Sequence, residues 1–281
     1  MGAASVVLLS VPFDPSRLRR EPVSWSAGLL TAAAVAIVAG GGLAAGMLTG
    51  GRPGAIGRAV AGTAVHGGFL ALGWIVAVGP LPSWGGLVSW SGVVLLLASV
   101  TSRFTIWGSL LYLLLPILLV RGGDQYPAMR NVGVGLNAGL KSIALGLAAG
   151  GFLGAHLLVS ASLTLGYGVR VTDPGQYLAF AAYDLGASAL TAEWLFRGAL
   201  FSHWWRRWEF WPAASASTAL AVGRYLLDPA LPATLEVRVG AVFYMALLGF
   251  SSCALRASSG SLLPGYLATG AFFLAYRMLA Q

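Results

Sequence analysis

The sequence predicts an all-α bundle of transmembrane helices, and composition is the first observation behind this prediction. Hydrophobic residues make up 57% of the 281-residue chain, whereas charged residues make up only 9%. An ordinary soluble domain has about a quarter of its residues charged. The apolar runs are numerous enough for roughly eight or nine helical spans of about 20 residues each. We therefore expect a polytopic integral membrane protein.

The second observation is the order of the apolar runs, which short polar connections separate. The expected spans are 26–48, 59–79, 86–101, 104–120, 139–165, 176–201, 212–228, 239–255 and 262–280. Residues 87–120 are nearly continuous and form either two short spans or one long bent helix.

These runs divide the chain into three parts. Residues 1–25 are expected to lie along a membrane surface or against another protein, since no positive region precedes the short apolar run there and a signal peptide is not predicted. Residues 26–130 form transmembrane helices of unassigned type. Residues 131–281 form a C-terminal helical domain.

The third observation is the distribution of charge. The formal net charge is +8, with sixteen Arg and the single Lys141, and most Arg lie between apolar runs. There they fix orientation and meet anionic lipid headgroups, so membrane lipids are expected partners and nucleic acid is not. If 87–120 makes two spans, the excess of Arg places the N-terminus in the cytoplasm. The Arg-over-Lys bias is typical of a GC-rich bacterial genome and points to the bacterial cytoplasmic membrane.

Two glycine series predict close packing of helices. Gly42, Gly46 and Gly50 are spaced by four, and so are the three glycines at 146, 150 and 154. Such spacing lines one helix face and lets another helix approach closely. We expect internal packing, with another chain as the alternative.

Tryptophan is concentrated after the sixth expected span. Five of the ten Trp fall within residues 194–211. The cluster there, called the belt below, consists of Trp204, Trp205, Arg206, Arg207, Trp208 and Trp211. Its composition predicts interfacial anchoring. A docking surface for protein, lipid or a pigment-like ligand is the alternative.

Glu193 and Arg197 are charged residues within an expected membrane span. Four residues separate them, so they lie on one helix face and are predicted to form a buried ion pair. Asp184 lies nine residues before Glu193. With 3.6 residues per turn, the two carboxylates are expected on opposite faces and not as a catalytic pair.

The C-terminal part of the sequence resembles a known family. The segment AEWLFRGALF at 192–201 is similar to the EExxxR motif of the CAAX protease and bacteriocin-processing (CPBP, or Abi) intramembrane proteases. SASTALAVGR at 215–224 takes the place of that family's FxxxH helix, and residues 239–273 resemble its terminal helix pair with the HxxxN motif. The resemblance covers roughly residues 140–280 and implies a CPBP-like helical fold.

The catalytic positions of that family are altered here. When the EExxxR motif is placed on this sequence, Ala192 stands at the position of the first acid. The second acid and the arginine of the motif are kept as Glu193 and Arg197. The histidine positions hold Arg224 and Thr269. Alanine cannot accept a proton, and arginine is permanently cationic, so neither replaces a base or a metal ligand. We therefore expect no enzyme activity, and a charge link from Arg224 to Glu193 or Asp184 is a hypothesis.

No other residues replace the missing ones. His203 is interpreted as interfacial, and His156 is a candidate to face the cavity. His66 lies in the part without resemblance, and Cys253 is the single cysteine, so no internal disulfide, metal site or cofactor is predicted.

Three functions are consistent with the sequence. The first is a non-enzymatic accessory or structural subunit, or a binding partner, within a larger membrane complex. The second is an active intramembrane protease of lipidated or membrane-embedded peptides, with Glu193 as base and His156 or His203 as helper. The third is a small-molecule transporter, against which the absence of a recognisable internal repeat counts.

Overall fold

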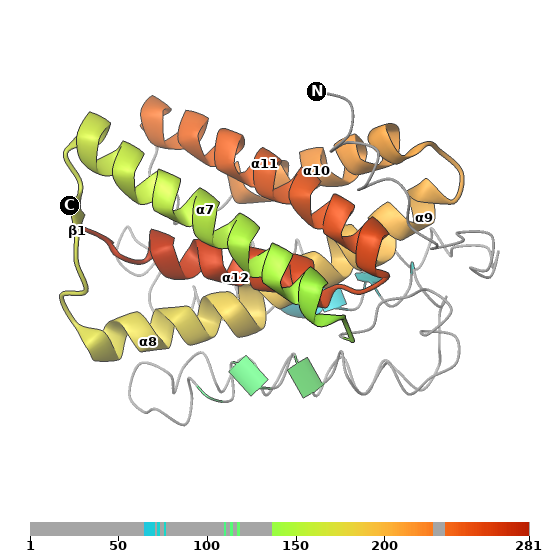
Figure 1. The fold of residues 1–281 in the computed structure, drawn as a ribbon, viewed down its shortest axis with the longest axis horizontal. Helices are drawn as coiled ribbons and strands as arrows, with labels where there is room; N and C mark the ends of the chain where they lie inside the picture. The colour runs from blue at the N-terminus through green and yellow to red at the C-terminus, as the bar shows by residue number, and fades with distance from the viewer. Residues whose placement is uncertain are drawn as a thin grey trace, which may run out of the picture.

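A computed structural model describes residues 65–70, 72–73, 76, 110, 113–114, 117–118, 137–226 and 234–280. Its continuous part is helical, as the sequence predicts (Figure 1). The helices are α7 (Leu140–Leu165), α8 (Pro174–Tyr183), η2 (Asp184–Leu190), η3 (Glu193–Phe201), α9 (Ser202–Trp205), α10 (Phe210–Leu226), α11 (Leu235–Ser259) and α12 (Leu263–Tyr276). The expected spans 26–48 and 86–101, and the glycine series from Gly42, lie outside the described residues.

Two short strands interrupt the all-helical pattern. β1 (Gly168–Val169) pairs antiparallel with β2 (Leu279–Ala280), so the connection after α7 lies beside the end of α12. Gly166, which closes α7, has a φ of 71°, a left-handed conformation that favours glycine. The strands are two residues long and fall outside any apolar alternation, which is why the sequence did not predict them.

Residues 174–205 form one continuous helical path through α8, η2, η3 and α9 (Figure 1). Asp173 caps its start, accepting hydrogen bonds from two backbone N–H groups, and Pro174 takes the first-turn position it favours. Two stretches of this path, η2 and η3, are π-helical. π-helical turns are rare in proteins and frequent at functional sites. This winding matters below, because it alters which side chains share a face.

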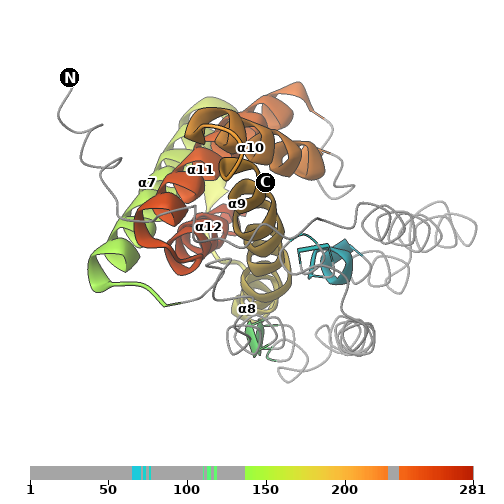
Figure 2. The ribbon, with the colours of Figure 1, turned by 90° about the vertical axis from the view of Figure 1, so that its right-hand side faces the viewer.

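α12 lies at the centre of the described helices, with α7 and α11 on one side and the α8–α9 path on the other (Figure 2). The three glycines predicted to permit close packing are on α7 and contact α12. A Cβ at Gly146 would clash with Pro264, one at Gly150 with Ala268, and one at Gly154 would lie 2.7 Å from the Ala275 side chain. The prediction of internal packing is therefore confirmed for this series.

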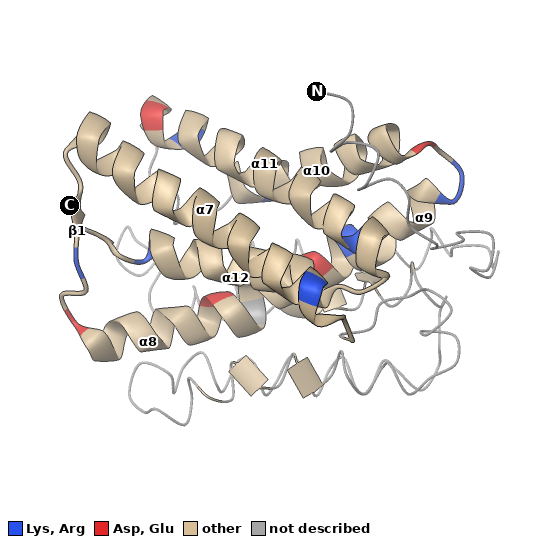
Figure 3. Ribbon diagram, in the orientation of Figure 1, with Lys and Arg blue, Asp and Glu red and all other residues tan. Residues whose placement is uncertain are grey.

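Within the described residues, α7 and α11 are the two helices long and apolar enough to cross a membrane. Both expose large apolar side chains on their outer surfaces, among them Leu163 at 80% and Phe152 at 70% on α7. On α11, Val239 and Phe243 are exposed in the same way. Charged residues gather at the helix ends and connections, while the middles are largely uncharged (Figure 3). A water-soluble domain covers such apolar faces, so this distribution is compatible with a membrane environment.

Candidate functional site

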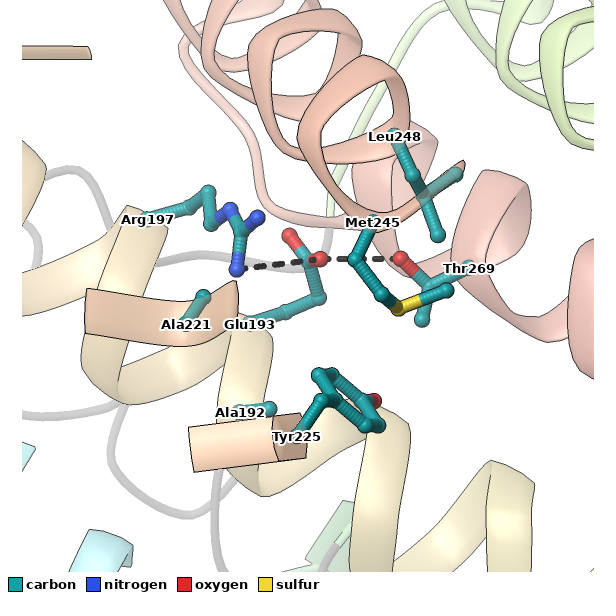
Figure 4. A pocket seen from close by; sticks show the side chains of 8 residues that line it. All are labelled: Ala192, Glu193, Arg197, Ala221, Tyr225, Met245, Leu248 and Thr269. Carbon is teal, nitrogen blue, oxygen red and sulfur yellow. Dashed lines mark hydrogen bonds and ion pairs between the residues drawn. The ribbon is translucent and has the colours of Figure 1, made fainter. Parts of the chain in front are cut away.

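A small pocket lies where η3, α10, α11 and α12 meet, and the two charged residues of η3 point into it (Figure 4). Its lining residues are Ala192, Glu193, Arg197, Ala221, Tyr225, Met245, Leu248 and Thr269. Its volume of ≈ 10 Å³ is about the room that one water molecule needs. The pocket is therefore far too small for a peptide.

Glu193 is the centre of this pocket. Its side chain is buried, and its Oε1 accepts a hydrogen bond of 2.8 Å from the Thr269 hydroxyl of α12. Nη1 of Arg197, one turn further along η3, lies 3.9 Å from the same oxygen. The Glu193 carboxylate thus lies between a cation on its own helix and a hydroxyl on the neighbouring helix. The family resemblance assigns Glu193 and Thr269 to one site, but the hydrogen bond between them, across 76 positions of the chain, comes from the structure alone.

Polar atoms around the pocket have unused hydrogen-bonding capacity. Oε2 of Glu193, Nε of Arg197 and Oγ of Ser252 are buried without a hydrogen-bond partner in the part of the chain that is described. Gly265 lies beside two of these atoms and has no Cβ to crowd them. A Cβ at this position would lie 3.1 Å from Oε2 of Glu193 and 3.2 Å from Oγ of Ser252. Such groups are costly when left dry, so this is a polar site that water can enter.

The second buried acid of this path also meets the segment that contains α12. Asp184 accepts two hydrogen bonds from the Arg277 guanidinium, at 2.5 and 2.9 Å. Asp184 contacts Arg277, the residue that follows α12, and Glu193 contacts Thr269 within α12, so the two acids face the same neighbouring segment and the prediction of opposite helix faces is wrong. The π-helical winding of η2, which lies between the two acids, is the physical reason, since each wider turn changes the angular position of every later residue. Their contacts are eight residues apart, about 12 Å along that segment, so they still form no carboxylate pair.

Arg224 does not form the charge link hypothesised from the sequence. Its guanidinium lies over the Tyr225 ring, 4.5 Å from the centroid, and 5.7 Å from that of Phe69. Asp184 is instead bound by Arg277, and Glu193 by Thr269. The aromatic faces attract the cation without a carboxylate.

The three histidines lie outside the pocket lining. His66 is buried and hydrogen-bonded to Tyr183 OH at 2.8 Å and to Thr191 at 3.1 Å. The sequence analysis named His156 as a candidate to face the cavity, but His156 lies exposed on α7. Its Nδ1 is 2.8 Å from the hydroxyl of Tyr244. The pocket thus holds no imidazole.

His203 is a correction to the sequence analysis, because it is buried and not interfacial. Only 4% of its surface is exposed, since it lies on the side of α9 that packs inward. Burial lowers the pKa of His203 to about 4, helped by the positive charges of Arg207 and Arg206. A neutral ring at this helix end is therefore part of the folded state.

We expect the stability of the protein to fall as the pH drops from about 6.5 to about 4. In this window the unfolded chain binds a proton at His203 and the folded chain does not, so unfolding is favoured as the pH falls. The loss is on the order of 1–2 kcal/mol after solvent screening is allowed for. Thermal unfolding of the wild type and of His203→Gln at several pH values measures it. A pH dependence in this window that is equally steep in His203→Gln contradicts the assignment.

The belt predicted from the sequence surrounds the turn between α9 and α10. Trp204 stacks on Trp208 with ring centroids 5.5 Å apart, and Trp205 stacks on Phe201 at 5.4 Å. Trp208 and Trp211 are 47% and 63% exposed. Half of the belt is therefore packed inward, and half faces outward.

Comparison with protein-family models, with curated proteins and with solved structures finds no match. Within the described ranges, no group of three His, Cys, Asp or Glu side chains is placed to hold a metal ion.

Proposed function

We propose that this chain is a non-enzymatic integral membrane protein on a CPBP-like scaffold. In this proposal it is an accessory or structural subunit of a larger membrane protein complex in a bacterial cytoplasmic membrane. Eight or nine spans cross that membrane, and the N-terminus lies in the cytoplasm. The support comes from the pocket, from one helix surface and from the charges at the helix ends.

The pocket supports the proposal that this chain has the scaffold of a protease but lacks the residues for proteolysis. Four positions matched to the family's motifs converge on it, since Ala192, Glu193, Arg197 and Thr269 all line the cavity. The residues that would activate water are nevertheless replaced: the first acid is alanine, and Thr269 donates to Glu193 where an imidazole would accept a proton. Glu193 itself is engaged by that hydroxyl and by Arg197. Without a second proton acceptor, acid–base hydrolysis lacks its machinery.

The observation that carries the subunit proposal is the exposed His156 on the outer surface of α7. The midpoint of this 26-residue helix lies between residues 152 and 153, so His156 is about 5 Å from it along the axis. Exposed apolar side chains such as Phe152 and Val159 surround it. An imidazole at this depth is well inside a hydrocarbon core about 30 Å thick, where polar groups normally face protein. Tyr244 contacts Nδ1 within the chain, and a neighbouring polypeptide over this face would cover the exposed remainder of the ring.

The charges at the helix ends support the proposed orientation. Lys141 at the start of α7, Arg206 and Arg207 after α9, and Arg256 in the last turn of α11 lie at one end of the described bundle. The opposite end has Arg170, Arg238 and, after α12, Arg277, together with acids at 173 and 236. The more positive end is assigned to the cytoplasm.

The test is gentle extraction from the native membrane, followed by separation at native size and mass spectrometry. We expect a stoichiometric set of membrane proteins to co-migrate with this chain. His156→Leu should weaken that association, whereas Leu220→Ala, a change at an exposed apolar residue of α10, should leave it intact.

A lone monomer would overturn the subunit proposal. Cleavage of a membrane-embedded peptide by the purified protein, abolished in Glu193→Gln, would overturn the non-enzymatic proposal and establish a protease.

A further inference from the structure

We propose that His156 donates a hydrogen bond from Nε2 to a carboxyl or amide oxygen on a transmembrane helix of a different polypeptide. The inference rests on the proposed function, because it needs a partner subunit in the membrane. It adds which atom of this chain meets that partner and which chemical group the partner brings. The depth of the imidazole, the position of its hydrogen and the supply of acceptors around it support the inference.

Two helices agree on the depth of His156. α7 and α11 lie side by side and run in opposite directions (Figure 1). His156 lies about 5 Å past the midpoint of α7, and Tyr244, which contacts it, lies about 4.5 Å before the midpoint of the 25-residue α11. In antiparallel helices these two offsets point the same way. The imidazole is therefore on the order of 10 Å inside a hydrocarbon core about 30 Å thick, out of reach of the lipid headgroups.

The contact with Tyr244 determines which ring nitrogen carries the hydrogen. Tyr244 is buried, and Nδ1 of His156, at 2.8 Å, is the acceptor that the described residues offer to its hydroxyl. A phenol hydrogen buried without an acceptor is costly, so the hydroxyl donates and Nδ1 accepts. The hydroxyl of Ser160 also contacts Nδ1, at 3.3 Å. A neutral imidazole then carries its hydrogen on Nε2, and no described residue accepts from that nitrogen.

A donor at this depth needs an acceptor that the bilayer itself does not supply. Acyl chains have no acceptor atoms, and the hydrocarbon core has no water. The backbone carbonyls of a neighbouring membrane helix are engaged in that helix's own hydrogen bonds. Carboxyl and amide side chains are costly when left unpaired in hydrocarbon, so a helix that carries one gains most from this donor. The exposed Nε2 thus selects a partner helix with such a side chain at the same depth.

A second copy of this chain is a poor source of that acceptor. Among the residues that the structure describes, every exposed carboxyl or amide side chain lies just before a helix or in its first turn. These residues are Asn137, Asp173, Gln176, Glu209 and Glu236. Asp184 and Glu193 lie further inside but are buried and engaged within the chain. The acceptor is therefore assigned to a different polypeptide.

The first experiment measures how firmly the partners stay bound to full-length His156 variants during mild extraction and separation at native size. His156→Phe keeps a flat ring without a donor and should weaken binding about threefold to tenfold, the scale measured for hydrogen bonds between membrane helices. His156→Gln should retain most of the binding, because its amide nitrogen reaches the position of Nε2. His156→Asn is the matched control, since its shorter amide reaches only the position of Nδ1, and it should lose as much as His156→Phe.

The outcomes separate this inference from the subunit proposal. A lone monomer in the wild type overturns the subunit proposal and the inference with it. Partners that stay equally bound to the wild type and to His156→Phe overturn the inference alone. An equal loss in His156→Phe, His156→Gln and His156→Asn overturns it as well, because the donor at Nε2 would then make no difference. The unfolding temperature of each variant shows that the protein is folded when its binding is compared.

The second experiment places the photo-crosslinking residue benzoylphenylalanine at position 152 and reads the adduct by mass spectrometry. Phe152 is exposed one turn before His156, with the two rings 6.4 Å apart, so the probe reports on the same neighbour without altering the imidazole. We expect an adduct on an apolar segment of another protein, within about one turn of an Asp, Glu, Asn or Gln. An adduct on lipid alone, or on a second copy of this chain, overturns the inference.

Discussion

Replacing Glu193 with alanine is expected to destabilise the protein by about 3–5 kcal/mol, which is typical for removing one partner of a buried ion pair. The substitution leaves the Arg197 guanidinium buried beside Met245 and Leu248 without a nearby carboxylate. It also removes the acceptor of the Thr269 hydroxyl. Thermal unfolding in a mild detergent, followed by tryptophan fluorescence, should show a Tm lower by on the order of 10 °C.

Two further variants separate this effect from a general loss of charge. Glu209→Ala removes an exposed carboxylate and should change stability by less than about 0.5 kcal/mol. Glu193→Leu/Arg197→Met removes both buried charges and should recover most of the stability, because apolar residues of similar volume replace a desolvated pair. A Glu193→Ala protein as stable as the wild type would show that the pair has no structural role.

Replacing Gly150 with valine is expected to prevent α7 from packing on α12. Even the first added carbon would clash with the backbone carbonyl of Ala268, and a backbone cannot move aside as a side chain can. Gly150→Ala should already cost about 1–3 kcal/mol, and the larger valine more. Protease resistance and the unfolding temperature of the purified variants measure the loss.

The adjacent glycine provides a matched control. Gly151 follows Gly150 on the same helix, but a Cβ there would meet nothing within 4 Å. Gly151→Ala should therefore be neutral or slightly stabilising, because alanine favours the helix over glycine. If both alanine variants unfold alike, the cost comes from helix propensity and not from the contact with α12.

Much of the helical architecture could be predicted because it depends on local patterns. The apolar run at 139–165 matches α7 closely and the run at 239–255 lies within the longer α11, since the chain needs only its own backbone to satisfy hydrogen bonds in a helix. The close packing of the Gly146 series could also be predicted from a local pattern, because a spacing of four residues marks one face of an α-helix. Predictions based on a single helix with ordinary winding were therefore reliable.

The predictions that failed depend on side chains from other helices or on irregular winding. Asp184 was placed on the wrong face because the π-helical stretch η2 runs from Asp184 toward Glu193, and composition gives no sign of it. His203 was assigned to the interface from its neighbours, although α9 turns it inward. Arg224 was expected to find a carboxylate, whereas the ring of its neighbour Tyr225 and that of the distant Phe69 lie under it.

The sequence by itself determined that this chain is apolar and helical, that Glu193 and Arg197 share one helix, and that positions 192, 224 and 269 hold alanine, arginine and threonine. Only the tertiary structure decided that Thr269 meets Glu193, that Asp184 meets Arg277 and that His156 faces outward. The physical reason is the range of the interactions. Hydrophobicity and helix periodicity act between near neighbours in the chain, whereas a buried polar contact depends on which distant helix packs beside it.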